Sequence, residues 1–207
     1  MHPASSVLMQ LEVETRAHHD DADAPWLELL LHDVTLERYI TQLVRTYGIE
    51  APLEAAFAYT PGLGAIVDLR SRARAGLIAQ DLLVLDLAPS AIANIPQSLA
   101  IAPFATPARA LGWLYVVERA SRLHDAVRDH LARLQPRVTG ACTYLCAYRG
   151  VRERRWSELG DVLEHVDARD HDELIAGAHD AFRAAQHWFE DGGAAPARYA
   201  DSMYSTR

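Results

Sequence analysis

The chain has 207 residues, half of them hydrophobic and 23% charged, and a formal net charge of −8 at pH 7. This length suits one domain with a single core. An acidic chain is not expected to bind nucleic acid, which normally requires a basic surface. No apolar stretch approaches the roughly 20 residues of a membrane helix, and the first residues lack the features of a signal peptide. We therefore expect a cytoplasmic protein without a membrane partner.

Helices are expected nearly throughout, because Ala, Leu, Arg and Glu dominate the periodic segments and β-branched runs are short. Residues 1–207 are predicted to form one all-α domain, a multi-helix bundle with flexible ends at 1–5 and 193–207. The first helices are expected over 6–19, 34–47, 52–59 and 71–87. Gly48 is the expected end of the second helix, and the proline-rich residues 88–107 are expected to be irregular.

A long central helix is predicted next, with Thr106 as its N-cap and Pro107 as its first residue. It should end before Pro136. Apolar residues at helical spacing predict its buried stripe: Trp113, Val116, Val117, Ala120, Leu123, Val127, Leu131 and Leu134.

The last part of the chain predicts three more helices. Two are expected over 139–148 and 153–165. The third should begin at Asp170, since Glu173 three residues later completes a capping-box pattern, and should end at Gly192.

Segments in this order resemble bacterial heme oxygenases, including those associated with bacteriophytochromes. LEVETRAHHDDAD near the N-terminus is similar to the family pattern L-x-x-x-T-R-x-x-H-x-x-x-E/D, and LGWLYVVE in the central helix is similar to the start of the family's distal helix. Further matching positions are Pro52-Leu53-Glu54, Arg72 with Asp81-Leu82, Tyr148-Arg149-Gly150 with Trp156, and Ala178, Phe182 and Trp188. The resemblance covers most of the chain and implies a heme oxygenase-like fold.

The resemblance also implies a function. Heme would be both cofactor and substrate, and it would be cleaved oxidatively to biliverdin, iron and CO. The heme supplies most of this chemistry, so the expected partners are an electron-donating reductase or ferredoxin and a bilin-binding photoreceptor.

On the proximal side, His19 falls on the position of the family's heme-iron ligand and Arg16 near a heme propionate. A guanidinium suits a carboxylate because it can pair with both oxygens. Asp23, one turn after His19, could orient the imidazole. From the residues alone, a solvated helix end or a pair of Arg16 with Glu12 or Asp20 remains an alternative.

On the distal side, the family usually has E-G-S-T-L-G-G, whereas this chain has E-R-A-S-R-L-H. The family glycines, which let the helix backbone approach the heme, correspond to Arg119, Leu123 and His124. Three alternatives stay open: a pocket closed by these side chains, a displaced helix that still admits heme, or His124 as a second axial ligand. In the second case Ser121 and Asp125 would order a distal water.

Three classes of function therefore compete. The first is a heme-degrading monooxygenase. The second is a catalytically degenerate heme- or bilin-binding or interaction protein of the same fold. The third is a di-iron oxidase of similar architecture, for which Glu14 with His18 and Glu118 with His124 make an unconvincing ligand set.

Overall fold

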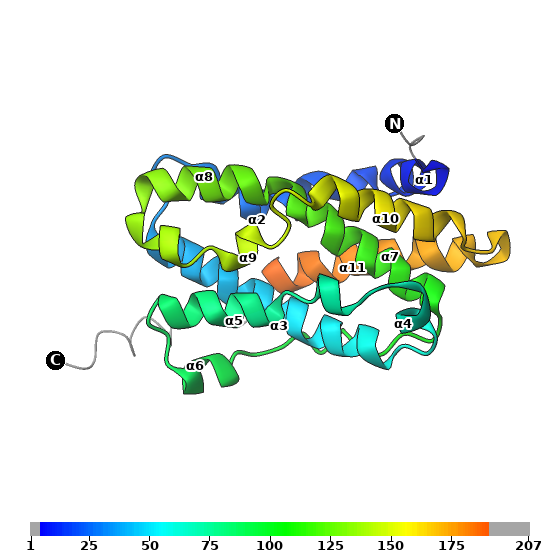
Figure 1. Cartoon of the computed structure of the whole chain (residues 1–207), viewed down its shortest axis with the longest axis horizontal. Coiled ribbons are helices and arrows are strands. Elements are labelled where there is room, and N and C mark those ends of the chain that lie inside the picture. The colour runs from blue at the N-terminus through cyan, green and yellow to red at the C-terminus, as the bar shows by residue number, and fades with distance from the viewer. Residues whose placement is uncertain (1–4, 191–207) are drawn as a thin grey trace.

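The computed structural model describes residues 5–190, and this part of the chain is built from helices and contains no β-strand (Figure 1). The all-α prediction is confirmed. The flexible ends expected at 1–4 and 193–207 lie outside the described residues. Ser5, expected in the flexible start, is the N-cap of the first helix and its hydroxyl donates to Glu164 Oε1 at 2.7 Å.

The described chain contains α-helices of very different lengths. They are α1 (Ser6–Glu14), α2 (His19–Leu27), α3 (Leu36–Tyr59), α4 (Leu63–Ile66), α5 (Ala75–Val84), α6 (Pro89–Ala93), α7 (Pro107–Ala120), α8 (His124–Leu134), α9 (Thr143–Cys146), α10 (Arg152–Glu164) and α11 (His171–Glu190). Short 3₁₀ turns link several of them: η1 (Arg16–His18), η2 (Glu28–Leu30), η3 (Arg70–Arg72), η4 (Ser121–Leu123), η5 (Pro136–Gly140) and η6 (Ala168–Asp170). No described helix is both long and apolar enough to span a bilayer.

The predicted helix end at Gly48 is wrong, because α3 continues through it to Tyr59. Pro52 has no N–H to donate to the Gly48 carbonyl, and the Ser98 N–H donates to that oxygen instead, at 2.8 Å. A Cβ at Gly48 would overlap the Trp188 ring. The glycine therefore allows close packing, and the helices expected over 34–47 and 52–59 are one.

Two other predicted helices are interrupted. The helix expected over 6–19 breaks at Thr15 into α1, η1 and α2, and the central helix is divided by η4 into α7 and α8. Thr106 does cap α7, since its side chain accepts from Arg109 N at 3.2 Å. The expected buried stripe is only partly right, because Leu134 is 42% exposed.

The remaining elements follow the prediction only in part, and the helix expected over 139–148 is reduced to the short α9. The helix expected over 71–87 starts only at Ala75, where Glu54 Oε1 accepts from the helix's first N–H at 2.7 Å. The segment expected to be irregular contains α6, and α10 lies within one residue of its expected bounds. The last helix begins at His171 after η6, whose N-cap is Asp167.

The core consists of two hydrophobic clusters along the length of the molecule. One joins α1, α7, α10 and α11, and the other joins α2, α5, α8 and α9. The long α3 contributes Val44 to the second and Leu53 to the first, with the buried Glu50 between them. Along the central helix, Glu118 and Arg119 likewise fall between the two clusters. A buried polar layer therefore separates them.

Candidate functional site

His19 is the first residue of α2 and is partly buried. Its Nε2 lies 3.1 Å from Thr15 Oγ1, and its ring centroid lies 5.7 Å from that of Phe182. Burial lowers the pKa of His19, and the positive charge of Arg119 lowers it further. The imidazole is therefore held in its neutral form, which a metal ion would require.

The hydrogen bonds of Thr15 determine which nitrogen of His19 carries the proton. The Thr15 hydroxyl donates to Leu11 O at 2.6 Å, so its single proton is used. Its oxygen can only accept from Tyr115 Oη at 3.2 Å and from His19 Nε2 at 3.1 Å. Nε2 of His19 is thus the protonated nitrogen in this arrangement, and Nδ1 keeps the free lone pair.

Arg119 fills the space beside His19. It is 2% exposed and forms two hydrogen bonds with the Asp23 carboxylate, Nη1 to Oδ1 at 2.8 Å and Nη2 to Oδ2 at 3.0 Å. Its guanidinium carbon lies 5.9 Å from the centroid of Phe182, the ring that also contacts His19. Asp23, expected to orient His19, therefore binds Arg119 instead.

These contacts test whether the residues would fit a heme. A porphyrin between His19 and the α7–α8 turn needs a flat slot over the imidazole. In the structure, the ion pair of Arg119 with Asp23 and the Phe182 ring occupy this region. Two cavities of about 730 and 690 Å³ lie elsewhere, and His19 lines neither. The side chains in their observed positions do not fit a heme at this site.

His124 lies in the second hydrophobic cluster, whereas His19 contacts Phe182 of the first. The His124 ring is 3% exposed, and its centroid lies 5.1 Å from Trp26 and 4.8 Å from Tyr144. Its Nε2 has no hydrogen-bond partner among the described residues. Burial lowers the pKa of His124 well below its usual range, and the charges of Arg74 and Arg152 act in the same direction.

The other sequence-predicted site residues lie apart from His19. The Ser121 hydroxyl donates to Glu118 O at 2.7 Å. Asp125 pairs with Arg128 at 2.6 Å and with Arg152 at 2.9 Å.

Arg16 and Leu123 are the last two predicted residues. Among the interactions of the described chain, Arg16 contacts His19 only through the backbone, where the His19 N–H donates to the Arg16 carbonyl, and none joins Leu123 to His19. Arg16 is exposed, and no ion pair joins it to Glu12 or Asp20 among the described residues. Leu123 is partly buried against the second hydrophobic cluster. Of the predicted set, the structure brings together His19, Arg119 and Asp23.

The sequence reasoning missed a buried polar layer next to this site. Arg72 pairs with Glu118 at 2.7 Å, and Tyr148 Oη donates to the same carboxylate at 2.7 Å. The only sign of this layer in the sequence was Glu118, a carboxylate inside the apolar stretch of the predicted central helix.

A second ion pair extends the layer. Arg74 pairs with Glu50 at 2.8 Å, and Tyr144 Oη donates to that carboxylate at 3.0 Å. Burial raises the pKa of Glu50 more than Arg74 lowers it. These charged side chains lie in the middle of the bundle, and their ion-pair partners are residues of this chain.

A histidine pair next to the site was also missed. His18 lies with Nε2 3.0 Å from His179 Nδ1, and its ring stacks on Phe182 at a centroid distance of 5.3 Å. Burial and the charge of the neighbouring His179 lower the pKa of His18. Two histidines are too few for a closed structural metal site, and the described residues contain no group of three or more His, Cys, Asp or Glu that could hold a metal ion.

Comparisons with known proteins do not add to this geometry. No family model, curated protein or solved structure matches the chain significantly.

Proposed function

We propose that this chain is a heme oxygenase-like protein that functions by binding and not by heme oxygenation. The single observation that supports this is the Arg119–Asp23 ion pair, which joins the distal helix to the proximal helix where heme would lie. Oxygenation requires that heme binds and that O₂ reaches the heme. A bidentate ion pair buried at that place opposes both. A reductase or ferredoxin is then not a required partner, whereas a photoreceptor remains a suitable one.

Heme oxygenation is the second candidate, and one observation favours it. His19 is held neutral at the family's ligand position by burial and by Arg119. If Arg119 left Asp23 to pair with a heme propionate, the slot would open and His19 would be available. This candidate therefore requires a large rearrangement of a side chain that is 2% exposed.

Titration of the purified protein with hemin distinguishes the two. We expect the wild type to give no Soret band that depends on His19, and no bilin absorbance after addition of ascorbate or a reductase. A Soret band that His19→Ala abolishes, followed by bilin formation, would overturn the proposal in favour of an oxygenase.

Two further variants test the closure itself. Arg119→Gly combined with Leu123→Gly restores the small residues of the family pattern, and we expect it to bind hemin at least tenfold more tightly than the wild type. Arg122→Ala is the matched control, because Arg122 lies 3.8 Å from Asp23 but is 46% exposed. Equal hemin affinity in all three proteins would show that Arg119 does not close the site.

A further inference from the structure

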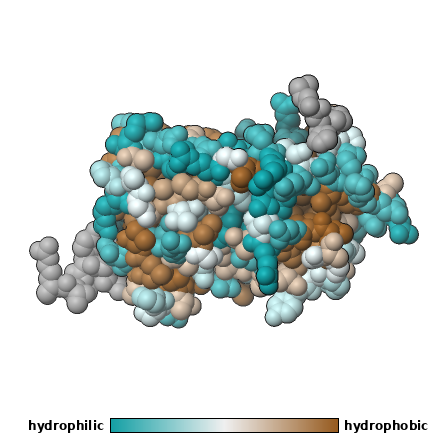
Figure 2. Space-filling model, viewed as in Figure 1, coloured by the Kyte–Doolittle hydropathy of each residue, from teal (hydrophilic) through white to brown (hydrophobic). Residues whose placement is uncertain are grey.

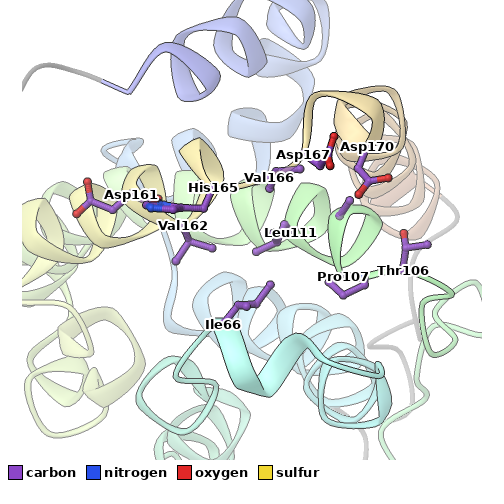
Figure 3. A pocket seen from close by; sticks show the side chains of 11 residues that line it. Ile66, Thr106, Pro107, Leu111, Asp161, Val162, His165, Val166, Asp167 and Asp170 are labelled. Carbon is purple, nitrogen blue, oxygen red and sulfur yellow. Dashed lines mark hydrogen bonds between the residues drawn. The ribbon is translucent and has the colours of Figure 1, made fainter.

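A cavity of about 730 Å³ lies on the side of the molecule away from His19, between α4, the start of α7 and the end of α10. Figure 3 shows that the side chains of Ile66 of α4, Val162 of α10 and Leu111 of α7 converge on the same space. This volume is within the range of small-molecule sites, which are concave and mostly apolar. Figure 2 shows the corresponding hydrophobic area between α4 and α10, bordered by hydrophilic residues.

The apolar part of the cavity is accessible to a ligand. Ile66 is 47% exposed although it is a large aliphatic residue, and Val162 and Val166 are partly buried. Leu111, at 1% exposure, belongs to the core and gives the cavity a firm floor. A ligand that covered Ile66 would gain from apolar burial without opening the core.

The charges at the cavity have one sign. Asp161 lies at one end and Asp167 and Asp170 at the other (Figure 3), and neither lysine nor arginine lines it. Arg169 pairs with Asp167 at 3.2 Å. No ion pair involves Asp161 or Asp170 within the described chain, so two carboxylates at the rim are left without a cationic partner.

The helix ends at the cavity do not change this sign. The start of α7 and the start of α11, directly after Asp170, bring positive helix ends, and the end of α10 brings a negative one. Each end amounts to about half an elementary charge, so their sum is smaller than the charges of the three carboxylates. The full charges of the carboxylates determine which ligand is attracted.

We propose that this cavity binds a small organic cation with an apolar body, such as an aryl-alkyl amine or quaternary ammonium compound. The apolar body would lie against Ile66, Val162 and Leu111, and the cationic group would pair with Asp161 or Asp170. This goes beyond the proposed function, because the cavity does not include the His19 and Arg119 region and does not depend on the outcome there.

Calorimetric titration with three probes that share a phenyl ring on a short alkyl chain tests the charge preference. The probes are 4-phenylbutyltrimethylammonium, the neutral 4-phenylbutanol and the anionic 4-phenylbutyrate. We expect the cation to bind at least tenfold more tightly than the anion at low salt, with a smaller difference at 0.5 M salt because the rim charges are screened. Equal or tighter binding of the anion, or no binding of the cation at millimolar concentration, would overturn the proposal.

Variants locate the binding. Asp161→Asn with Asp170→Asn should weaken cation binding at least fivefold, and Ile66→Trp, which places a ring in the cavity, should weaken all three probes. Glu28→Gln with Glu37→Gln is the control for overall charge, since it also removes two carboxylates and both residues are exposed. Circular dichroism confirms that each variant is folded. If the control and the aspartate double variant weaken binding equally, the cavity is not the site.

Discussion

The two ends of α7 contact their neighbours in opposite ways. At its first half, Gly112 meets α11 so closely that a Cβ would lie 2.5 Å from Ala178 N, and Gly177 of α11 leaves no room for a Cβ beside Arg109. At its second half, Glu118 and Arg119 reach neighbouring elements through long charged side chains. At the first contact the helix backbones approach closely because glycine has no side chain. At the second, ion pairs between long side chains bridge a wider distance.

This difference bears on the positions at which the heme oxygenase pattern has glycine and this chain has larger residues. Helices approach closely where both surfaces are small, as at Gly112 and Gly177. At the position where a heme would need that close approach, the chain has Arg119, and the Arg119 side chain binds Asp23. The two halves should therefore respond differently to substitution.

The largest effect is expected at the glycine crossing. Gly112→Ala places a methyl group against the backbone of α11, which has no flexible side chain to move aside. We expect a loss of about 3 kcal/mol in the free energy of unfolding, measured by urea denaturation. Gly76→Ala is the control, because nothing lies within 4 Å of a Cβ there and alanine favours the helix by about 0.5 kcal/mol. Equal effects at both positions would contradict the close approach.

The second prediction concerns the charged half. Asp23→Ala leaves the buried guanidinium of Arg119 unpaired, and we expect a loss of about 2 kcal/mol in unfolding free energy. This is below the usual cost of breaking a buried pair, because the Asp23 side chain is 20% exposed.

Arg119→Met is the matched change on the other side of the pair. It should cost less, about 1 kcal/mol, since a partly exposed carboxylate can be hydrated. If Arg119→Met were the more damaging variant, the arginine would contribute mainly through packing against Phe182 rather than through its charge.

The third prediction uses the pH. The pKa of His124 is far below its usual value because the ring is buried, so the unfolded chain takes up a proton that the folded chain does not. The contribution of the neutral, buried His124 to the free energy of unfolding is complete above about pH 6.5. It is lost as the pH falls below that value.

Between pH 7.5 and 5.5 the wild type should therefore lose about 1 kcal/mol more than His124→Phe, which keeps a ring between Trp26 and Tyr144. Urea denaturation at the two pH values measures this. His18 and His19 share the sign of this shift and are present in both proteins, so the difference isolates His124. A parallel loss in both proteins would contradict a neutral, buried His124.

The sequence predicted local features well and contacts between distant segments poorly. Thr106 and Pro107 mark a helix start because capping is a local interaction. Gly48 was misread because its role depends on Trp188 and Ser98, which are far away in the chain.

The same limit applies to the candidate site. The Thr15 and His19 pattern singled out His19, but it did not predict the helix break at Thr15. Nor did it predict that Arg119 binds Asp23, because these residues are 96 positions apart. Nothing in the local pattern of either segment indicates the other. The separation of His124 from His19 depends equally on packing of the two hydrophobic clusters.

The smallest effect is expected at an exposed ion pair. Arg137 lies 2.5 Å from Asp86, at distances as short as those in the buried layer, but the two side chains are 57% and 77% exposed. Water and salt screen such a pair, so Arg137→Ala should change the unfolding free energy by less than about 0.5 kcal/mol. Urea denaturation of this variant beside Asp23→Ala compares two short ion pairs that differ in burial. A similar loss in both would mean that ion-pair geometry, and not the burial of Arg119, determines the cost of opening the site.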